Sequence, residues 1–211
     1  MTRGSNMEAI LSRAPLIPVL VIEQPEWAVP LARALVQGGL PVLEVTLRTP
    51  AALEAVAAIR NEVPGALVGV GTVVQAGQFA QARDAGALFA VSPGFTEALA
   101  AAAGALPWLP GIATASEAML AIQHGYTTLK FFPAEQAGGI PMLKALAGPF
   151  PELRFCPTGG ITAASAADYL ALPNVLCVGG SWLTGQARLE AGDWAGIERE
   201  ARALCARLGR G

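Results

Sequence analysis

The chain has 211 residues, of which 53% are hydrophobic and only 14% charged, so it is long and apolar enough to bury one large core. This composition excludes an intrinsically disordered protein, a collagen and a coiled coil. The 14 basic and 16 acidic residues give a net charge of −2 without any block of like charges, so we expect no nucleic-acid partner.

Two apolar stretches raise the question of a membrane span or a secretory signal, and neither fits. Residues 98–116 carry no charge but include two prolines, and the stretch 14–22 is broken by prolines and lacks a cleavage site. Three widely spaced cysteines fit neither a disulfide framework nor a zinc site. We therefore expect a cytoplasmic protein that binds neither membrane nor metal. Residues 1–6 are expected to be disordered or a remnant of cloning.

Short apolar runs alternate with longer alanine-rich segments from one end of the chain to the other. The first run, 16–22, is typical of a buried strand, and the segment 26–37 after it is typical of a helix that ends at glycine. The pair recurs about every 23 residues, enough for a strand, a three-turn helix and two loops. The predicted strands are 16–22, 41–46, 67–71, 88–91, 107–112, 127–132, 153–157 and 175–178; the predicted helices are 26–37, 50–62, 76–85, 96–103, 115–124, 139–147, 163–170 and 194–208.

Eight strand–helix units predict an α/β fold of the (β/α)8 TIM barrel type. Continuous apolar strands such as 16–22 belong to parallel sheets that helices cover. An open doubly wound sheet would use about five to seven strands and often a glycine-rich first turn, so eight units favour the barrel. Because no linker divides the chain, we expect 1–211 to form a single (β/α)8 barrel domain.

A lysine at the end of the sixth predicted strand is the sharpest chemical signal. The chain has two lysines; Lys144 lies in a predicted helix, whereas Lys130 lies between leucine and phenylalanine. Active sites of barrels lie at the carboxyl ends of the strands. Burial there penalises the charged ammonium and favours a neutral, nucleophilic amine, which could form an imine with a ketone. The alternative is a structural lysine paired with a carboxylate.

Glu44 is the candidate partner of that lysine. It alternates with Val42 and Thr46 in the second predicted strand and therefore points toward the barrel interior. Side chains from even-numbered strands share layers inside a barrel, so Glu44 and Lys130 can meet there. A carboxylate beside the amine could shuttle protons, although a plain buried ion pair would use the same geometry.

Two glycine-rich turns follow the last two predicted strands, TGGI at 158–161 and GGS at 179–181. Barrels often bind phosphate at these two positions, where glycine lets backbone N–H groups approach the anion. Arg48 and Thr72 follow the second and third strands and could hold a carboxylate, although a surface arginine and a capping threonine are ordinary alternatives. The single histidine, His124, is expected to stabilise a helix end.

Seven motifs in these positions resemble one known family. They are LEVTLRT at 43–49, GVGTV at 69–73, SPG at 92–94, PGI at 110–112, LKFFPAE at 129–135, RFCPTGGI at 154–161 and GGSWL at 179–183. In this order they resemble the class I aldolases that act on 2-keto-3-deoxy-6-phosphogluconate (KDPG) or 4-hydroxy-2-oxoglutarate (KHG). The only departure noted is Gln136-Ala137, where the family usually has an asparagine.

The resemblance implies an aldolase that needs no cofactor or metal, usually a homotrimer, in Entner–Doudoroff catabolism. KDPG would be cleaved reversibly to pyruvate and glyceraldehyde 3-phosphate, with Lys130 as the Schiff-base lysine and Glu44 as the proton shuttle. The remaining implied roles form two groups: Arg48, Thr72, Pro93 and Phe132 for pyruvate and its carboxylate, and Gly159, Gly160, Gly180 and Ser181 for the phosphate.

Three alternatives remain open at this point. A related aldolase could act on KHG or on the galactonate analogue with the same lysine. A non-catalytic barrel could bind a phosphorylated metabolite, with Lys130 and Glu44 as a structural pair. An isomerase or epimerase would rely on acid–base residues alone, and the lack of a suitable histidine or second strand-end carboxylate argues against it.

Overall fold

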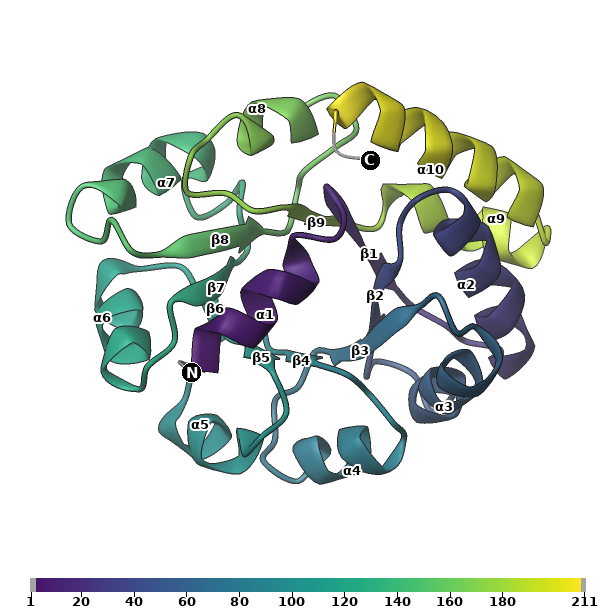
Figure 1. Ribbon diagram of the computed structural model, residues 1–211, viewed down its shortest axis with the longest axis horizontal. Coiled ribbons are helices and arrows are strands. Elements are labelled where there is room, and N and C mark those ends of the chain that lie inside the picture. Colours follow the sequence, from purple (N-terminus) through teal and green to yellow (C-terminus); the bar gives the residue numbers. More distant parts are fainter. Residues whose placement is uncertain (1–2, 210–211) are drawn as a thin grey trace.

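The computed structural model describes residues 3–209, in which parallel strands lie inside a ring of helices (Figure 1). The strands are β1 (Leu16–Leu20), β2 (Val42–Thr46), β3 (Leu67–Gly71), β4 (Ala90–Val91), β5 (Trp108–Leu109), β6 (Gly111–Ile112), β7 (Thr128–Phe131), β8 (Arg154–Pro157) and β9 (Val178–Gly180). The α-helices are α1 (Arg3–Leu11), α2 (Ala28–Gln37), α3 (Ala52–Glu62), α4 (Gln78–Asp84), α5 (Glu97–Ala103), α6 (Ala115–Gln123), α7 (Gly139–Ala147), α8 (Ala166–Leu170), α9 (Gln186–Glu190) and α10 (Trp194–Leu208). Two 3-10 turns, η1 (Pro25–Trp27) and η2 (Trp182–Thr184), complete the described elements.

The strands form two parallel sheets that curl into a half-barrel. Six strands pair in the order β5-β4-β3-β2-β1-β9, and three pair in the order β6-β7-β8. Only Pro110, which cannot donate a backbone hydrogen bond, separates β5 from β6. Two single bridges, Phe155 to Val175 and Thr158 to Gly179, join β8 to the segment that contains β9. The predicted parallel α/β architecture is confirmed at this level.

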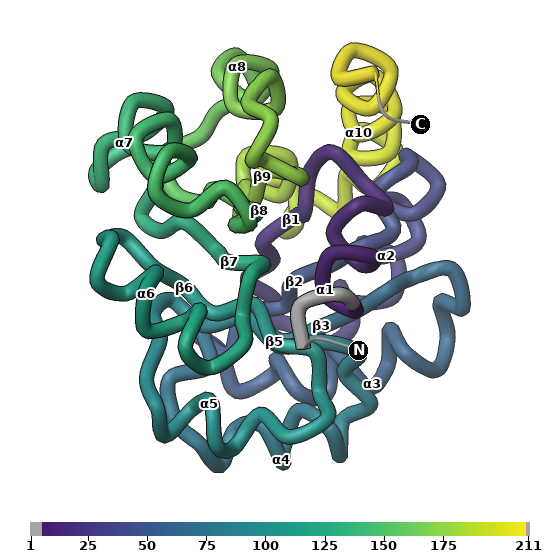
Figure 2. Tube along the Cα trace, turned by 60° about the vertical axis from the view of Figure 1, so that its left-hand side comes forward, coloured from purple at the N-terminus to yellow at the C-terminus, as the bar shows by residue number. Residues whose placement is uncertain are grey.

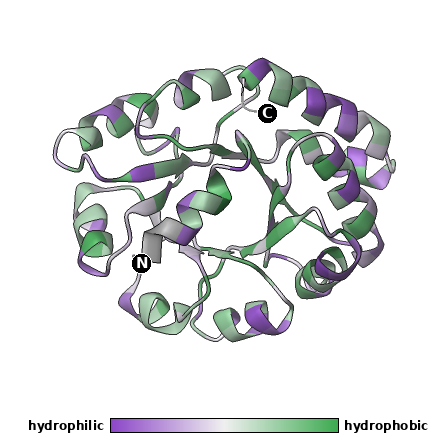
Figure 3. Ribbon diagram, in the orientation of Figure 1, coloured by the Kyte–Doolittle hydropathy of each residue, from purple (hydrophilic) through white to green (hydrophobic). Residues whose placement is uncertain are grey.

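The core lies between the sheets and the surrounding helices. The strands are mostly hydrophobic, and hydrophilic residues gather on peripheral helices such as α10 (Figure 3). Helix starts follow the local sequence: Thr114 caps α6, and its capping box with Glu117 satisfies the first free N–H groups. At helix ends, Gly86 and Gly125 adopt positive φ angles that end the helical path.

Helix α1 is an addition to the repeating pattern. It is not one of the helices that form the ring, and in Figure 1 it lies over the strands, within the outline of that ring. Figure 2 shows the same helix from another side. Its Met7 and Leu11 are fully buried against Ile17 and Val42, near the amino ends of β1 and β2. The sequence predicts no regular structure in residues 1–6, whereas α1 begins at Arg3; residues 1 and 2 lie outside the described residues.

Two predicted boundaries differ from the structure near the glycine turns. The helix predicted over 163–170 begins at Ala166, because Thr162 and Ser165 bond each other's backbone N–H groups at 3.0 and 3.3 Å in a preceding turn. The strand predicted over 175–178 is β9, which begins at Val178, and Val175 contributes only an isolated bridge. The helix α9 between η2 and α10 is not predicted from the sequence.

Candidate active site

Lys130 and Glu44 meet inside the half-barrel, as the alternation of their strands predicts. Nζ of Lys130, on β7, lies 3.3 Å from Oε1 of Glu44, on β2, and the two side chains are 7% and 4% exposed. Of the residues whose burial the structure describes, no other charged residue is buried. The same amine lies 5.2 Å from the ring centroid of Phe132. The amine and the carboxylate thus lie together in a site with little access to solvent. The attraction between the two groups offsets the free energy lost when each is removed from water.

Glycine on β3 makes room for the carboxylate. Gly69 and Gly71 are the register partners of Glu44 and Thr46 on the neighbouring strand. A Cβ atom on Gly71 would overlap Oε1 of Glu44, and one on Gly69 would lie 2.6 Å from the ring of Phe89. The glycines are therefore required for close approach, and Gly71 determines where the Glu44 carboxylate lies.

A cavity of about 170 Å³ opens at the carboxyl ends of the strands, between Arg48 and the two glycine-rich turns. Six predicted site residues line it: Arg48, Phe132, Gly159, Gly160, Gly180 and Ser181. Among the lining residues that the structure describes, Arg48 alone is charged. The cavity therefore offers one cation and a run of glycine backbone, which suits a small anion.

The first glycine turn depends on positive φ angles that other residues rarely adopt. Gly159 has φ +105° and Gly160 has φ +79°, and a Cβ on Gly160 would lie 2.6 Å from Cγ of Glu135. Backbone N–H groups of Ala134 and Glu135 donate to the carbonyls of Thr158 and Gly159 at 2.8 and 3.1 Å. The loop after β7 therefore supports the turn after β8.

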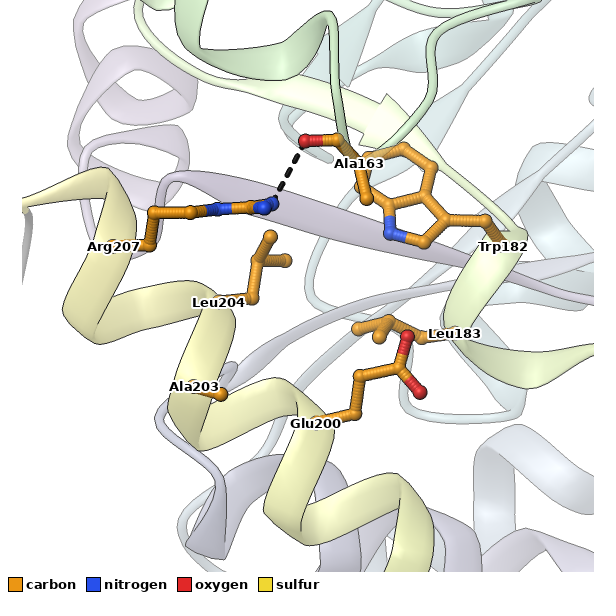
Figure 4. Close-up of a pocket in the computed structure, with 7 residues that line it drawn as sticks. All are labelled: Ala163, Trp182, Leu183, Glu200, Ala203, Leu204 and Arg207. Atoms are coloured by element: carbon orange, nitrogen blue, oxygen red, sulfur yellow. Dashed lines mark hydrogen bonds between the residues drawn. The ribbon is translucent and has the colours of Figure 1, made fainter.

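The second glycine turn is backed by an indole ring. A Cβ on Gly180 would overlap the six-membered ring of Trp182, so the ring lies directly against this turn. On its outer side lies a surface groove that Glu200, Leu204 and Arg207 help to line (Figure 4). Nε1 of Trp182 is buried and has no hydrogen-bond partner within residues 3–209.

Thr72 and Pro93 lie next to the site without lining the cavity. Thr72 directly follows Gly71 and has φ +62°, an uncommon conformation for a β-branched residue. The carbonyl of Pro93 packs against Cα of Gly111, the register partner of Lys130. The turn that contains Pro93 is held by Ser92, whose Oγ donates to the Gly94 carbonyl at 2.7 Å.

Five further residues line the cavity. Thr158, Ile161 and Gly179 belong to the two predicted glycine-rich turns but have no predicted role of their own, and Val19 and Val21 are not predicted site residues. A signal exists for Thr158, a polar residue that ends an apolar strand and begins a glycine turn. Val19 and Val21 carry no such signal, because valine is typical of any buried strand. His124 lies at the C-cap of α6, as predicted, 3.7 Å from Glu97.

The family model described as "KDPG and KHG aldolase" matches residues 7–200. This chain belongs to that family. The KHG/KDPG aldolase of Escherichia coli strain K12 is 54% identical over 200 residues, which cover 94% of each chain. Among solved structures, the KDPG aldolase of Legionella pneumophila, with pyruvate captured as a covalent carbinolamine, is 48% identical with a TM-score of 0.91 over 94% of this chain and 97% of that chain.

The structure of the KDPG aldolase of Zymomonas mobilis with 3-phosphoglycerate is also similar, with 50% identity and a TM-score of 0.90 over 95% of each chain. The range that matches the KDPG and KHG aldolase family model, 7–200, contains every residue of the candidate site. Within the described residues, no three His, Cys, Asp or Glu side chains are arranged to hold a metal ion. No described helix is both long and apolar enough to cross a bilayer.

Proposed function

We propose that this protein is a class I aldolase that cleaves KDPG reversibly to pyruvate and glyceraldehyde 3-phosphate, as a step of Entner–Doudoroff catabolism. The observation that carries the proposal is the buried Lys130–Glu44 pair at 3.3 Å, next to a cavity lined by glycine backbone and one arginine. The family supplies the reaction class, and the covalent pyruvate of the Legionella relative supports a lysine that reacts with the ketone.

The reaction begins when Glu44 accepts a proton from the ammonium of Lys130, which leaves a neutral, nucleophilic amine. Its Nζ attacks the C2 carbonyl, and Glu44 moves the protons needed to form the carbinolamine and to expel water as the iminium forms. Glu44 then accepts the proton of the C4 hydroxyl while the C3–C4 bond breaks. The bonding electrons pass into the iminium and give an enamine, and glyceraldehyde 3-phosphate leaves. Protonation at C3 and hydrolysis release pyruvate and free Lys130.

Two groups of residues near this pair would bind the two ends of the substrate. Arg48 and Thr72 would hold the pyruvate carboxylate, with Pro93 and Phe132 shaping the pocket. The phosphate would bind to the backbone of the turns that contain Gly159, Gly160, Gly180 and Ser181. Their position on one cavity supports this assignment, as does the relative whose structure contains 3-phosphoglycerate.

A second substrate is supported by the bifunctional name of the E. coli relative. KHG presents the same ketone and 4-hydroxyl to Lys130 but ends in a carboxylate in place of a phosphate. We propose that this protein cleaves KHG as well, with lower catalytic efficiency, because a carboxylate makes fewer bonds to the glycine turns than a phosphate does.

The finer architecture is also part of the proposal. We propose that the two sheets form one closed (β/α)8 barrel, in which β5 and β6 are two halves of a single strand interrupted at Pro110. The single bridges from Phe155 to Val175 and from Thr158 to Gly179 support closure on the other side. An amide hydrogen-exchange map in which all eight strand positions are protected together would test it.

We further propose a cytoplasmic homotrimer. Val74 and Met119 are large hydrophobic side chains that are each 54% exposed, which supports an interface between subunits. Within the described residues, no disulfide joins Cys156, Cys177 or Cys205, which fits a reducing compartment. Analytical ultracentrifugation of the purified chain tests the trimer, and a monomer at all concentrations would contradict it.

The decisive experiment for the reaction is borohydride reduction in the presence of pyruvate, followed by intact mass and peptide mapping. We expect a stable pyruvyl adduct on Lys130 and none on Lys144, the other lysine of the chain. Folded protein without an adduct would overturn the aldolase and favour a non-catalytic metabolite-binding protein.

A further inference from the structure

Glu135 has two distinct contacts behind the first glycine turn. Its side-chain stem lies against Gly160, where a Cβ would come within 2.6 Å of Cγ. Its carboxylate accepts a hydrogen bond of 2.5 Å from the hydroxyl of Tyr169, on α8. The residue is exposed, so without this bond the carboxylate could adopt other rotamers, including ones closer to the phosphate-binding side of the turn.

Tyr169 is well suited to hold the carboxylate in one place. The residue is 1% exposed, and its hydroxyl lies 3.1 Å from the position that a Cβ on Gly139 would occupy, at the start of α7. Burial and the neighbouring Glu135 raise its pKa well above the ordinary value, so the hydroxyl remains a donor. The donor is therefore fixed by packing, and the mobile partner is the carboxylate.

A carboxylate beside a phosphate-binding turn is an electrostatic problem. A phosphate carries up to two negative charges, and a third charge a few ångströms away lowers its affinity. We propose that Tyr169 and Glu135 are a positioning pair, an inference that rests on the phosphate site of the proposed function. The Glu135 stem supports the Gly159–Gly160 turn, and Tyr169 keeps the Glu135 charge away from the bound phosphate.

The test combines Tyr169→Phe, Glu135→Gln and the double variant. In Tyr169→Phe we expect the KM for KDPG to rise about three- to tenfold while kcat stays within about twofold. The dissociation constant of inorganic phosphate, measured by phosphorus NMR titration, rises by the same factor. In the double variant the KM for KDPG and the dissociation constant of phosphate return close to the wild-type values, because the side chain at position 135 no longer carries a charge. The KM for KHG changes less than the KM for KDPG.

Two controls separate this role from a merely structural one. Tyr126→Phe removes the hydroxyl of the other tyrosine, which packs against Trp108 and Phe95, and leaves phosphate affinity unchanged. Glu135→Lys keeps an aliphatic stem and reverses the charge, so it tightens phosphate binding several-fold even if Tyr169→Phe fails to fold.

Failure of the pair and failure of the proposed function give different results. An unchanged phosphate affinity in Tyr169→Phe and Glu135→Lys overturns the positioning role, and so does a loss in Tyr169→Phe that Glu135→Gln does not restore. The proposed function fails if the wild-type protein forms no adduct on Lys130. The phosphate titration requires no turnover and remains informative in that case.

Discussion

Gly71 lies so close to Glu44 that one methyl group on its α-carbon would overlap Oε1 of the carboxylate. Gly71→Ala therefore displaces the carboxylate from its position 3.3 Å from Nζ of Lys130. We expect kcat for KDPG cleavage to fall about 100-fold, because small displacements of a proton-transfer group are costly. Stopped-flow or coupled assays measure this effect.

The matched control for Gly71→Ala is Gly77→Ala. A Cβ on Gly77 meets nothing within 4 Å, and its φ of −63° suits alanine. We expect wild-type kcat and equal or slightly higher stability from this variant. If Gly71→Ala had the same kcat as Gly77→Ala, the placement of Glu44 would not matter for the reaction.

Removing the amine of Lys130 should abolish activity and also destabilise the fold. Lys130→Met leaves the carboxylate of Glu44 buried without its ion-pair partner, which lowers the free energy of unfolding by about 3 kcal/mol. The double variant Lys130→Met with Glu44→Met removes both charges and should recover most of that loss while remaining inactive. Urea titrations at pH 7 compare the three proteins, and equal stability of all three would contradict a buried charge pair.

Gly180→Ala tests the second glycine turn. A methyl group there would overlap the Trp182 ring, so the turn must shift. We expect the KM for KDPG to rise about tenfold, with a smaller change in the rate of pyruvate adduct formation at Lys130. Gly185→Ala is the control, because a Cβ on Gly185 meets nothing within 4 Å. Equal effects on KDPG and on pyruvate would show that this turn does not act on the phosphate end.

The Tyr169 hydroxyl predicts a specific loss of stability at high pH. Burial, followed by the hydrogen bond and charge of Glu135, raises the pKa of Tyr169 above its ordinary value of 10.0. As the pH rises, Tyr169 therefore loses its proton in the unfolded chain before it does so in the folded protein. Its contribution to the free energy of unfolding is complete below about pH 10 and declines as the pH rises further. The stability advantage of wild type over Tyr169→Phe should stay constant from pH 8 to about 9 and shrink as the pH rises above about 10 in urea titrations. A constant difference across this whole range would contradict the raised pKa.

The central pair could be predicted from the sequence because its residues violate the local pattern. Lys130 and Glu44 are charged residues inside apolar strands, and the strand alternation places both on the inner face. The glycines of the two turns were predictable for a similar reason, since they follow strands at positions where barrels bind anions.

The supporting contacts could not be predicted in the same way. Tyr169 and Glu135 are 34 residues apart, and neither departs from what is ordinary in its own segment. The need for glycine at position 71 arises from a side chain on the neighbouring strand, a packing relationship that no local pattern encodes. Helix α1 was missed because its first residues, Arg3 to Asn6, are polar and show no apolar periodicity.

The position of helix α1 also bears on where small molecules enter and leave the protein. Met7 and Leu11 are buried at the amino ends of β1 and β2, so α1 covers the interior at that end of the strands. The cavity beside Arg48 opens at the opposite end, where the strands have their carboxyl ends. We therefore expect substrate to enter and products to leave at the carboxyl ends of the strands, where the cavity beside Arg48 opens.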